Sequence, residues 1–315
     1  MRLKKSANKI LKECMGLKSD ESCLIVTDKN KLEIGEALLD SAKEITKGDV
    51  ELIEIPVGER HGKEPDSHVA KRMREFDVVL IPTTKSLSHT KARKEACATG
   101  ARLASMPGIT NYVFLRVSDA DLNQITDLNK KIGEILDKGR EVHVTTEKGT
   151  DIKFSINRRN AKQDSGLLLK KGDSGNIPAG EVFLAPVEGT ANGVFIIDNG
   201  VGGIGRTKKE IRVEVKDGFA VKIEGNNELV KTLQKVKDKN AYNIAEFGIG
   251  TNKKARITGN TLEDEKVLGT CHIAFGNNSG FGGKISVPVH IDGIISKPTI
   301  LVDGEKMMVD GKLVV

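Results

Sequence analysis

The chain has 315 residues, of which 38% are hydrophobic and 30% charged, so it can bury the cores of two domains and is not a disordered protein. The net charge of +6 comes from 50 basic and 44 acidic residues that are mixed along the chain, and aromatic residues make up only 3%. Binding to nucleic acid is therefore not expected. No apolar run approaches the roughly 18 residues that span a bilayer, and no apolar segment follows the basic start of the chain. We expect a soluble cytoplasmic protein that does not bind membranes.

The cysteines do not form the pairs that are typical of zinc sites or disulfide frameworks. No C-x-x-C spacing occurs among Cys14, Cys23, Cys97 and Cys271. We therefore expect reduced and mostly buried thiols. Cys271 stands beside His272, so a ligand or nucleophile at this position is the alternative to a buried small residue.

Short aliphatic runs alternate with helical patterns through the first part of the chain. The predicted strands are residues 23–27, 50–55, 77–81 and 112–115. The predicted helices are residues 33–46, residues 67–75 and a helix that begins at Thr90. Helices that alternate with continuous aliphatic strands indicate a doubly wound parallel sheet. We expect residues 1–138 to form an N-terminal α/β domain.

Basic side chains follow the third predicted strand. Ligands favour the carboxyl ends of parallel strands, so His89, Arg93 and Arg102 are candidates for holding an anionic group there. The alternative is that Ser88 or Thr90 caps a helix whose exposed face carries the basic side chains.

From residue 141 the pattern changes to strict alternation, which is typical of antiparallel strands with one buried face. Residues 142–146 and 151–156 form one predicted hairpin. Residues 211–215 and 219–223 form another around Asp217-Gly218, a dipeptide that tight hairpin turns prefer. With a single helix at residues 228–239, residues 139–315 are predicted to be a mainly antiparallel, β-rich catalytic domain.

One glycine-rich segment matches the G-x-G-x-x-G fingerprint of dinucleotide-binding proteins. It runs from Gly200 to Gly205, but it leads into the strand at residues 211–215, whereas the fingerprint requires a helix at that point. We therefore reject a dinucleotide site and expect an irregular loop near the functional site.

The segment from Glu246 to Asp292 holds two of the six histidines and several carboxylates among glycines and small residues. His290 and Asp292 lie two apart in a run that alternates with aliphatic residues from position 285, so on a strand they share a face. An imidazole beside a carboxylate is a ligand set that zinc, cobalt, manganese and iron accept. The alternative is a hydrogen-bonded histidine followed by an Asp292-Gly293 turn. His272 and Glu265 lie close by in the sequence and favour the metal.

A further carboxylate, Glu181, follows Pro178 and Gly180 and opens an apolar strand, where a buried charge requires a cationic partner. Its segment belongs to a series of motifs along the chain: N-I-P-A-G-E-V-F-x-x-P, A-E-F-G-I-G-T-N, D-E-K-x-x-G-T-x-H-I-A-F-G and H-x-D-G. The series spans roughly residues 170–305 and closely resembles the aminopeptidase T / aminopeptidase S family of thermophilic metallo-aminopeptidases. The segment S-L-S-H-T-x-A-R in the first domain also resembles that family.

This resemblance implies a cytoplasmic homodimer that removes N-terminal residues from short peptides with a free N-terminus. It also implies two divalent metal ions per chain (Zn, Co or Mn), which activate a water molecule, with Glu246 as the bridging carboxylate. Carried over position by position, the implied ligands are Glu181, Glu246, Glu265, His272, His290 and Asp292. The family has a tyrosine shortly after H-I-A-F-G, where this chain has Ser279 nearby.

The general base and the residues that bind substrate are not assigned. Glu181, Glu263 and Asp264 are all conceivable bases. Two alternatives keep the fold but change the function. In one, His290, Asp292 and one more ligand hold a single iron ion in a ring-cleaving dioxygenase of dihydroxypyridine. In the other, the chain is a catalytically degenerate metal-binding protein.

Overall fold

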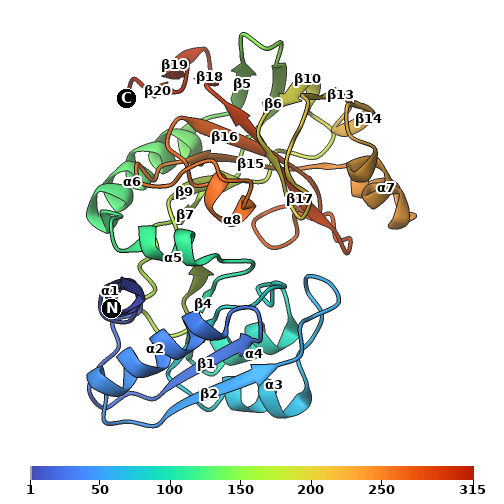
Figure 1. Ribbon diagram of the computed structural model, residues 1–315. Coiled ribbons are helices and arrows are strands. Elements are labelled where there is room, and N and C mark those ends of the chain that lie inside the picture. Colours follow the sequence, from blue (N-terminus) through green and yellow to red (C-terminus); the bar gives the residue numbers. More distant parts are fainter. Residues whose placement is uncertain (1) are drawn as a thin grey trace. The chain divides into compact units, whose positions relative to one another are not determined.

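The computed structural model describes residues 2–315 and has the expected mixed α/β architecture, with a parallel sheet followed by antiparallel sheets (Figure 1). The chain divides into two compact units. The first unit runs to Leu122 and also includes Gly166–Ala179, and the second comprises Asn123–Ser165 and Gly180–Val315. The boundary expected after residue 138 falls inside the second unit.

The first unit is built on a five-stranded sheet in the order β2-β1-β3-β4-β8, with every neighbouring pair parallel. Its strands are β1 (Cys23–Asp28), β2 (Val50–Ile55), β3 (Val78–Ile81), β4 (Arg102–Ser105) and β8 (Ser174–Asn176). Its helical segments are α1 (Arg2–Lys9), a π-helical turn η1 (Ile10–Cys14), α2 (Leu32–Ile45), α3 (Ser67–Met73), α4 (Lys91–Ala98) and α5 (Asn111–Val117). Strands β1 and β3 are buried throughout, as their continuous aliphatic sequences predict.

One strand of this unit was predicted at the wrong place. Residues 112–115 lie in helix α5, where the side chain of Thr110 accepts a hydrogen bond from the backbone of Val113 and caps the helix. The strand that pairs with β3 on the side away from β1 is β4, which the prediction omitted. A short apolar run such as Tyr112–Leu115 has no periodicity that separates a strand from a buried helix, so the cap decides the structure.

A helix cap and a buried ion pair occur among the residues that were considered for an anion site after β3. Thr90 caps α4 by accepting a hydrogen bond from the backbone of Arg93, as the alternative reading predicted. The side chain of Arg102 is only 4% exposed, and its two terminal nitrogens lie 2.9 and 2.6 Å from the carboxylate oxygens of Glu21. Its Nε atom also donates to the carbonyl of Met15. Arg102 is therefore a buried structural residue.

Replacing Glu21 with glutamine is expected to lower the free energy of unfolding by about 2 kcal/mol at neutral pH, because Arg102 loses its buried counter-charge. The hydrogen bond from Arg102, opposed by burial, holds the pKa of Glu21 below its usual value. A lowered folded-state pKa stabilises the protein above the unfolded-state pKa of about 4.3, and this contribution is lost as pH falls through the folded-state pKa.

Urea unfolding at several pH values tests this expectation, since the stability gap between wild type and Glu21→Gln should narrow below about pH 4. The control is Glu44→Gln, which removes an ion pair with Lys4 whose side chains are 50% and 56% exposed, and which should have little effect. A gap that stays constant with pH would contradict the assigned role of the ion pair.

The second unit contains two antiparallel sheets, the first with eight strands in the order β14-β13-β10-β6-β5-β18-β19-β20. These strands are β5 (Glu141–Thr145), β6 (Asp151–Ser155), β10 (Asn192–Ile197), β13 (Ile211–Lys216), β14 (Phe219–Glu224), β18 (Thr299–Val302), β19 (Glu305–Val309) and β20 (Lys312–Leu313). The two predicted hairpins are confirmed as the pairs β5/β6 and β13/β14.

The other sheet has seven strands in the order β12-β11-β17-β16-β15-β9-β7. These strands are β7 (Lys162–Asp164), β9 (Glu181–Leu184), β11 (Gly200–Val201), β12 (Gly205–Arg206), β15 (Ile244–Gly250), β16 (Thr270–Gly276) and β17 (His290–Ser296). The remaining helical segments are α6 (Leu122–Lys138), α7 (Asn227–Lys235), the 3-10 turn η2 (Lys239–Tyr242) and α8 (Thr261–Asp264). Across residues 2–315, no helix has both the length and the apolar character that a membrane span requires.

A shared core joins the two sheets of the second unit. Phe154 of one sheet lies 5.2 Å from Phe247 of the other, measured between ring centroids, and Phe195 and Phe275 lie 5.7 Å apart. All four rings belong to one buried cluster. One face of the seven-stranded sheet therefore packs in this core, and polar side chains can lie on its other face.

Candidate metal centre

Strand β15 shows how the seven-stranded sheet separates core from site. Side chains on a strand point alternately to its two faces. Phe247 and Ile249 join the hydrophobic cluster, so Glu246, Gly248 and Gly250 point to the opposite face. The sequence E-F-G-I-G therefore places one carboxylate and two glycines on the face that is not packed against the other sheet.

The predicted ligands lie on four neighbouring strands, and the register of the strands brings them to the same face. The opposed pairs are Glu181 with Gly250, His272 with Gly248, Asp292 with Ala274, and His290 with Gly276. Residues directly opposite each other share a face of the sheet. Glycine thus lies opposite Glu181, His272 and His290 on one side, and Ala274 lies opposite both Glu246 and Asp292. These small residues leave room for the larger side chains to converge.

Gly248 shows most clearly how a small residue makes room for a ligand side chain. A Cβ atom built on Gly248 would lie 2.1 Å from Nε2 of His272 and 2.2 Å from its Cε1. Real Cβ atoms do not approach so closely, so the imidazole occupies the space that only glycine leaves open.

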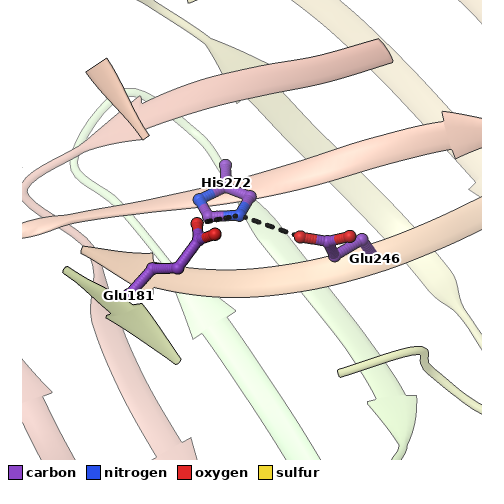
Figure 2. Close-up of side chains that lie close together, drawn as sticks. All are labelled: Glu181, Glu246 and His272. Atoms are coloured by element: carbon purple, nitrogen blue, oxygen red, sulfur yellow. Dashed lines mark hydrogen bonds and ion pairs between the residues drawn. The ribbon is translucent and has the colours of Figure 1, made fainter. Parts of the chain in front are cut away.

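His272 lies between two carboxylates, as Figure 2 shows. Its Nε2 atom lies 3.2 Å from Oε1 of Glu246 and 3.5 Å from Oε2 of Glu181. All three residues are buried, and their ligand atoms lie within 4.8 Å of one another. They form the first of two groups that could hold a metal ion.

The second group comprises Glu246, His290 and Asp292. Nε2 of His290 lies 3.4 Å from Oε2 of Glu246 and 3.3 Å from Oδ1 of Asp292. Glu246 is common to both groups, and its two oxygens face the two histidines. The shared face of His290 and Asp292 is thus as expected, although β17 begins only at His290 and residues 285–289 are not in a strand. The alternative Asp292-Gly293 turn is wrong, because Gly293 pairs with Ile273 inside the sheet.

The ring of His290 is held from its other side. Its Nδ1 atom lies 2.8 Å from the carbonyl oxygen of Asn277, which can only accept a hydrogen bond, so Nδ1 carries the proton. In the neutral ring Nε2 is then left with its lone pair toward Glu246 and Asp292, as a metal ligand requires. The ring of Phe281 also contacts His290 edge-on, with centroids 5.7 Å apart.

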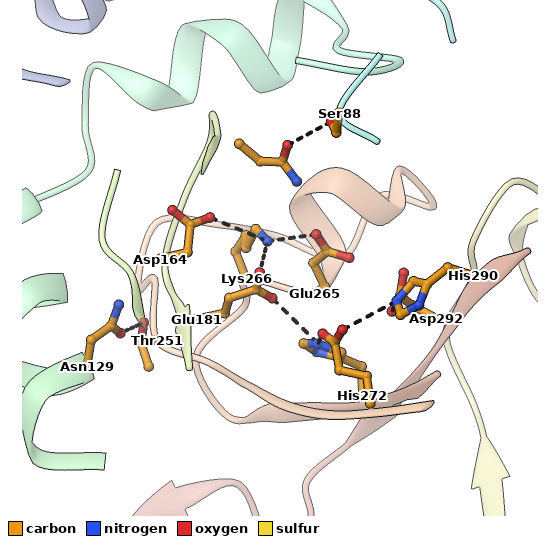
Figure 3. A network of polar contacts seen from close by, with 12 residues as sticks. Ser88, Asn129, Asp164, Glu181, Thr251, Glu265, Lys266, His272, His290 and Asp292 are labelled. Atoms are coloured by element: carbon orange, nitrogen blue, oxygen red, sulfur yellow. Dashed lines mark hydrogen bonds and ion pairs between the residues drawn. The ribbon is translucent and has the colours of Figure 1, made fainter. Parts of the chain in front are cut away.

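Glu265 follows helix α8 and belongs to neither group. Its Oε1 atom lies 2.7 Å from Nζ of Lys266, which also lies 2.5 Å from Oε1 of Glu181 (Figure 3). Burial disfavours the ammonium form, but the charges of Glu181, Glu265 and Asp164 outweigh burial and raise the pKa of Lys266 well above its usual range. Burial raises the pKa of Glu265 to about 8, although the charge of Lys266 opposes the shift.

The two histidines lie in a strongly negative environment. Burial opposes protonation of His272, but its hydrogen bond to Glu246 and the nearby carboxylates raise its pKa to about 9. Burial likewise opposes protonation of His290, but Asp292 and Glu246 raise its pKa well above the usual range. Burial should raise the pKa of Glu246, yet both histidines together lower it. The cluster therefore attracts positive charge to its centre.

The residues fit a bound cation. The buried Oε2 atom of Glu181 has no hydrogen-bond partner among the described residues, although a buried polar atom normally has one. Glu181 Oε2 faces the imidazole of His272. A mixed set of imidazole and carboxylate donors around one volume is the chemistry of a divalent transition metal.

Other candidates have structural roles. The carboxylates of Glu263 and Asp264 accept hydrogen bonds from the backbone of residues 256–259 and lie outside both groups. The Cys271 side chain is in the hydrophobic core, so the buried reading is confirmed. Ser279 donates from Oγ to the side chain of Asn277. The glycine-rich segment lies beside the site, since the backbone of Gly202 donates to the carbonyl of Asp292. It is not the irregular loop that was expected, because β11 and β12 pair as an antiparallel hairpin.

Comparison with known proteins decides the family. The sequence model of the 2,5-dihydroxypyridine 5,6-dioxygenase (NicX) family matches residues 6–315. The chain belongs to this family. A 2,5-dihydroxypyridine 5,6-dioxygenase from Pseudomonas putida strain KT2440 is 25% identical over 254 residues, covering 75% of this chain and 71% of the relative.

Two solved structures share the fold. The structure of the Pseudomonas putida KT2440 dioxygenase has a TM-score of 0.85 at 19% identity and covers 99% of this chain and 97% of its own. Wild-type AmpT from Thermus thermophilus has a TM-score of 0.74 at 17% identity and covers 100% of this chain and 99% of its own. The fold is thus common to proteins with different names.

These comparisons overturn several predictions. Membership of the aminopeptidase T / aminopeptidase S family is wrong, and so is the function of a metallo-aminopeptidase or peptide hydrolase. A metal centre is supported, but a pair of Zn, Co or Mn ions is not. The motifs behind the resemblance lie largely on β9, β15, β16 and β17 and in the turn before β16, which build a sheet that AmpT shares. They therefore indicate the fold and the position of the site, and the dioxygenase alternative agrees better with the family.

Sequence reasoning missed three participants in the site. Lys266 was quoted only as part of the D-E-K motif, since lysine is usually exposed. Gly248 was not singled out, although its alternation with Phe247 and Ile249 in the sequence indicates its face. The carbonyl of Asn277 has no sequence signal, because any residue supplies a carbonyl.

Proposed function

We propose that this protein is an iron-dependent dioxygenase that opens the ring of a dihydroxypyridine. The observation that carries the proposal is the convergence of His272 and His290 on the two oxygens of one carboxylate, with Asp292 beside His290. Two histidines and one carboxylate with open positions form the ligand set of non-haem iron(II) oxygenases. Membership of the dioxygenase family supports the reaction class.

In this proposal His272, His290 and Asp292 hold the ion, and Glu246 supplies the negative charge that both imidazoles face. An iron(II) ion held there supplies the one-electron chemistry that lets dioxygen react with an aromatic ring. The hydrogen bond between His290 Nδ1 and the carbonyl of Asn277 fixes the tautomer of the neutral ring whose Nε2 lone pair faces the ion. Phe281, packed edge-on against His290, limits rotation of that ring.

The test is an assay of the iron-loaded protein with 2,5-dihydroxypyridine under an atmosphere of labelled dioxygen. Dioxygen uptake should match substrate loss one for one, and the product should contain both labelled oxygen atoms, since a dioxygenase inserts the whole molecule. A chelator should stop the reaction and iron(II) should restore it. Iron-loaded protein that consumes no dioxygen with this substrate would overturn the proposal.

A further inference from the structure

Lys266 is the only lysine among the largest fully buried side chains of the described chain, and it lies at the edge of the metal site. Its side chain is 0% exposed, and its ammonium contacts three carboxylates. The distances from Nζ are 2.5 Å to Glu181, 2.7 Å to Glu265 and 3.8 Å to Asp164 (Figure 3). Lysine is almost never fully buried unless it is paired, so the three carboxylates explain its position.

Glu181 connects Lys266 with His272. Its Oε1 atom binds the ammonium, while its Oε2 atom lies 3.5 Å from Nε2 of His272. Glu265 contacts the same ammonium from the end of helix α8. Glu181 and Glu265 are two of the six ligands that the two-metal prediction required, and a fixed positive charge already lies between them.

We propose that Lys266 acts as the second cation of this site, so that the protein holds one divalent ion, near His272 and His290, and excludes another from Glu181 and Glu265. A second ion between these carboxylates would have to displace the ammonium or lie beside it. Two positive charges that close together repel strongly in a buried setting, because the effective dielectric constant there is far below that of water. This inference deepens the proposed function, from which it takes the position of the first ion.

The test counts bound manganese(II), a redox-stable probe, after equilibrium dialysis and elemental analysis. Wild type is expected to hold one ion per chain. Lys266→Met keeps the length of the side chain but removes its charge, so Glu181 and Glu265 become free to bind a second ion, and the count should rise to two. Glu265→Gln in the wild-type background should leave the count at one, because in this proposal Glu265 pairs with lysine and not with metal.

The matched control is Lys148→Met, which removes a lysine that also contacts two carboxylates, Asp198 and Glu210, but is half exposed. Its count should remain at one. The proposal is overturned if wild type holds two ions, if Glu265→Gln loses an ion, or if folded Lys266→Met still holds one. The first two outcomes remain decisive even if Lys266→Met does not fold.

The result is independent of the proposed reaction. Wild type with one manganese ion but no ring cleavage after iron loading would defeat the dioxygenase proposal and leave the role of Lys266 intact. Ring cleavage by the iron-loaded wild type, together with a single bound ion in folded Lys266→Met, would support the dioxygenase proposal and defeat the proposed role of Lys266.

Discussion

Replacing His290 with alanine is expected to weaken iron(II) binding by at least about 100-fold and to abolish dioxygen-dependent turnover while the fold persists. His290 is the proposed ligand that Asn277, Phe281 and Asp292 hold in place together. Its removal takes away one of two imidazole donors and leaves Glu246 and Asp292 without the group between them. Iron content after anaerobic dialysis and the circular dichroism spectrum measure the two parts of this expectation.

The matched control is His143→Ala, because His143 also pairs with an aspartate, at 2.7 Å from Asp151, but on the eight-stranded sheet. This variant should bind iron and turn over substrate like wild type. Equal iron content in both histidine variants would show that His290 is not a ligand.

Introducing a single methyl group at Gly248 is expected to displace His272 and to lower iron affinity by about 10- to 100-fold or more. The added Cβ of Gly248→Ala would lie 2.1 Å from Nε2 of His272, and its three nearest neighbours are all atoms of that imidazole. Overpacking of this kind costs about 1–3 kcal/mol of stability, and the imidazole has to rotate away from Glu246 to relieve it. Isothermal titration with manganese(II) and thermal unfolding measure both effects.

Two further variants separate this steric effect from general damage. Gly280→Ala adds the same methyl group where nothing lies within 4 Å, so ion binding should not change. The double variant Gly248→Ala/His272→Ala should bind the ion no worse than His272→Ala alone, because the group that clashes with the methyl is gone. Additive losses in the double variant would mean that Gly248 acts through something other than His272.

Much of the site was predictable from local patterns. The spacing of His290 and Asp292 predicted that they share a face of a strand. They do so because both residues lie in β17. Phe247 and Ile249 alternate with Glu246 and Gly248 in the same way, so the same period of two separates the core face of β15 from its site face. The dipeptide Asp217-Gly218 predicted a tight hairpin turn from local conformation. Both residues adopt the positive φ that such a turn requires.

Less was predictable where a short segment has no clear period. Residues 112–115 read as a strand because they are apolar, but the Thr110 cap starts a helix. Strand β4 was missed because its four residues begin with Arg102, whose charge is neutralised by Glu21, a residue 81 positions away in the sequence. The predicted aminopeptidase family was wrong because the motifs lie in a sheet that is common to solved structures with different names.

By itself, the sequence determined the mixed α/β class and the shared face of His290 and Asp292, because these depend on the periodicity of neighbouring residues. Only the tertiary structure decided which donors meet, with Glu246 between His272 and His290, because the order and register of the strands set those distances. It alone also placed Lys266 against Glu181, 85 residues away in the sequence. No local pattern encodes a contact of that separation, since a buried lysine and an exposed lysine look the same until the sheet brings the carboxylates around it.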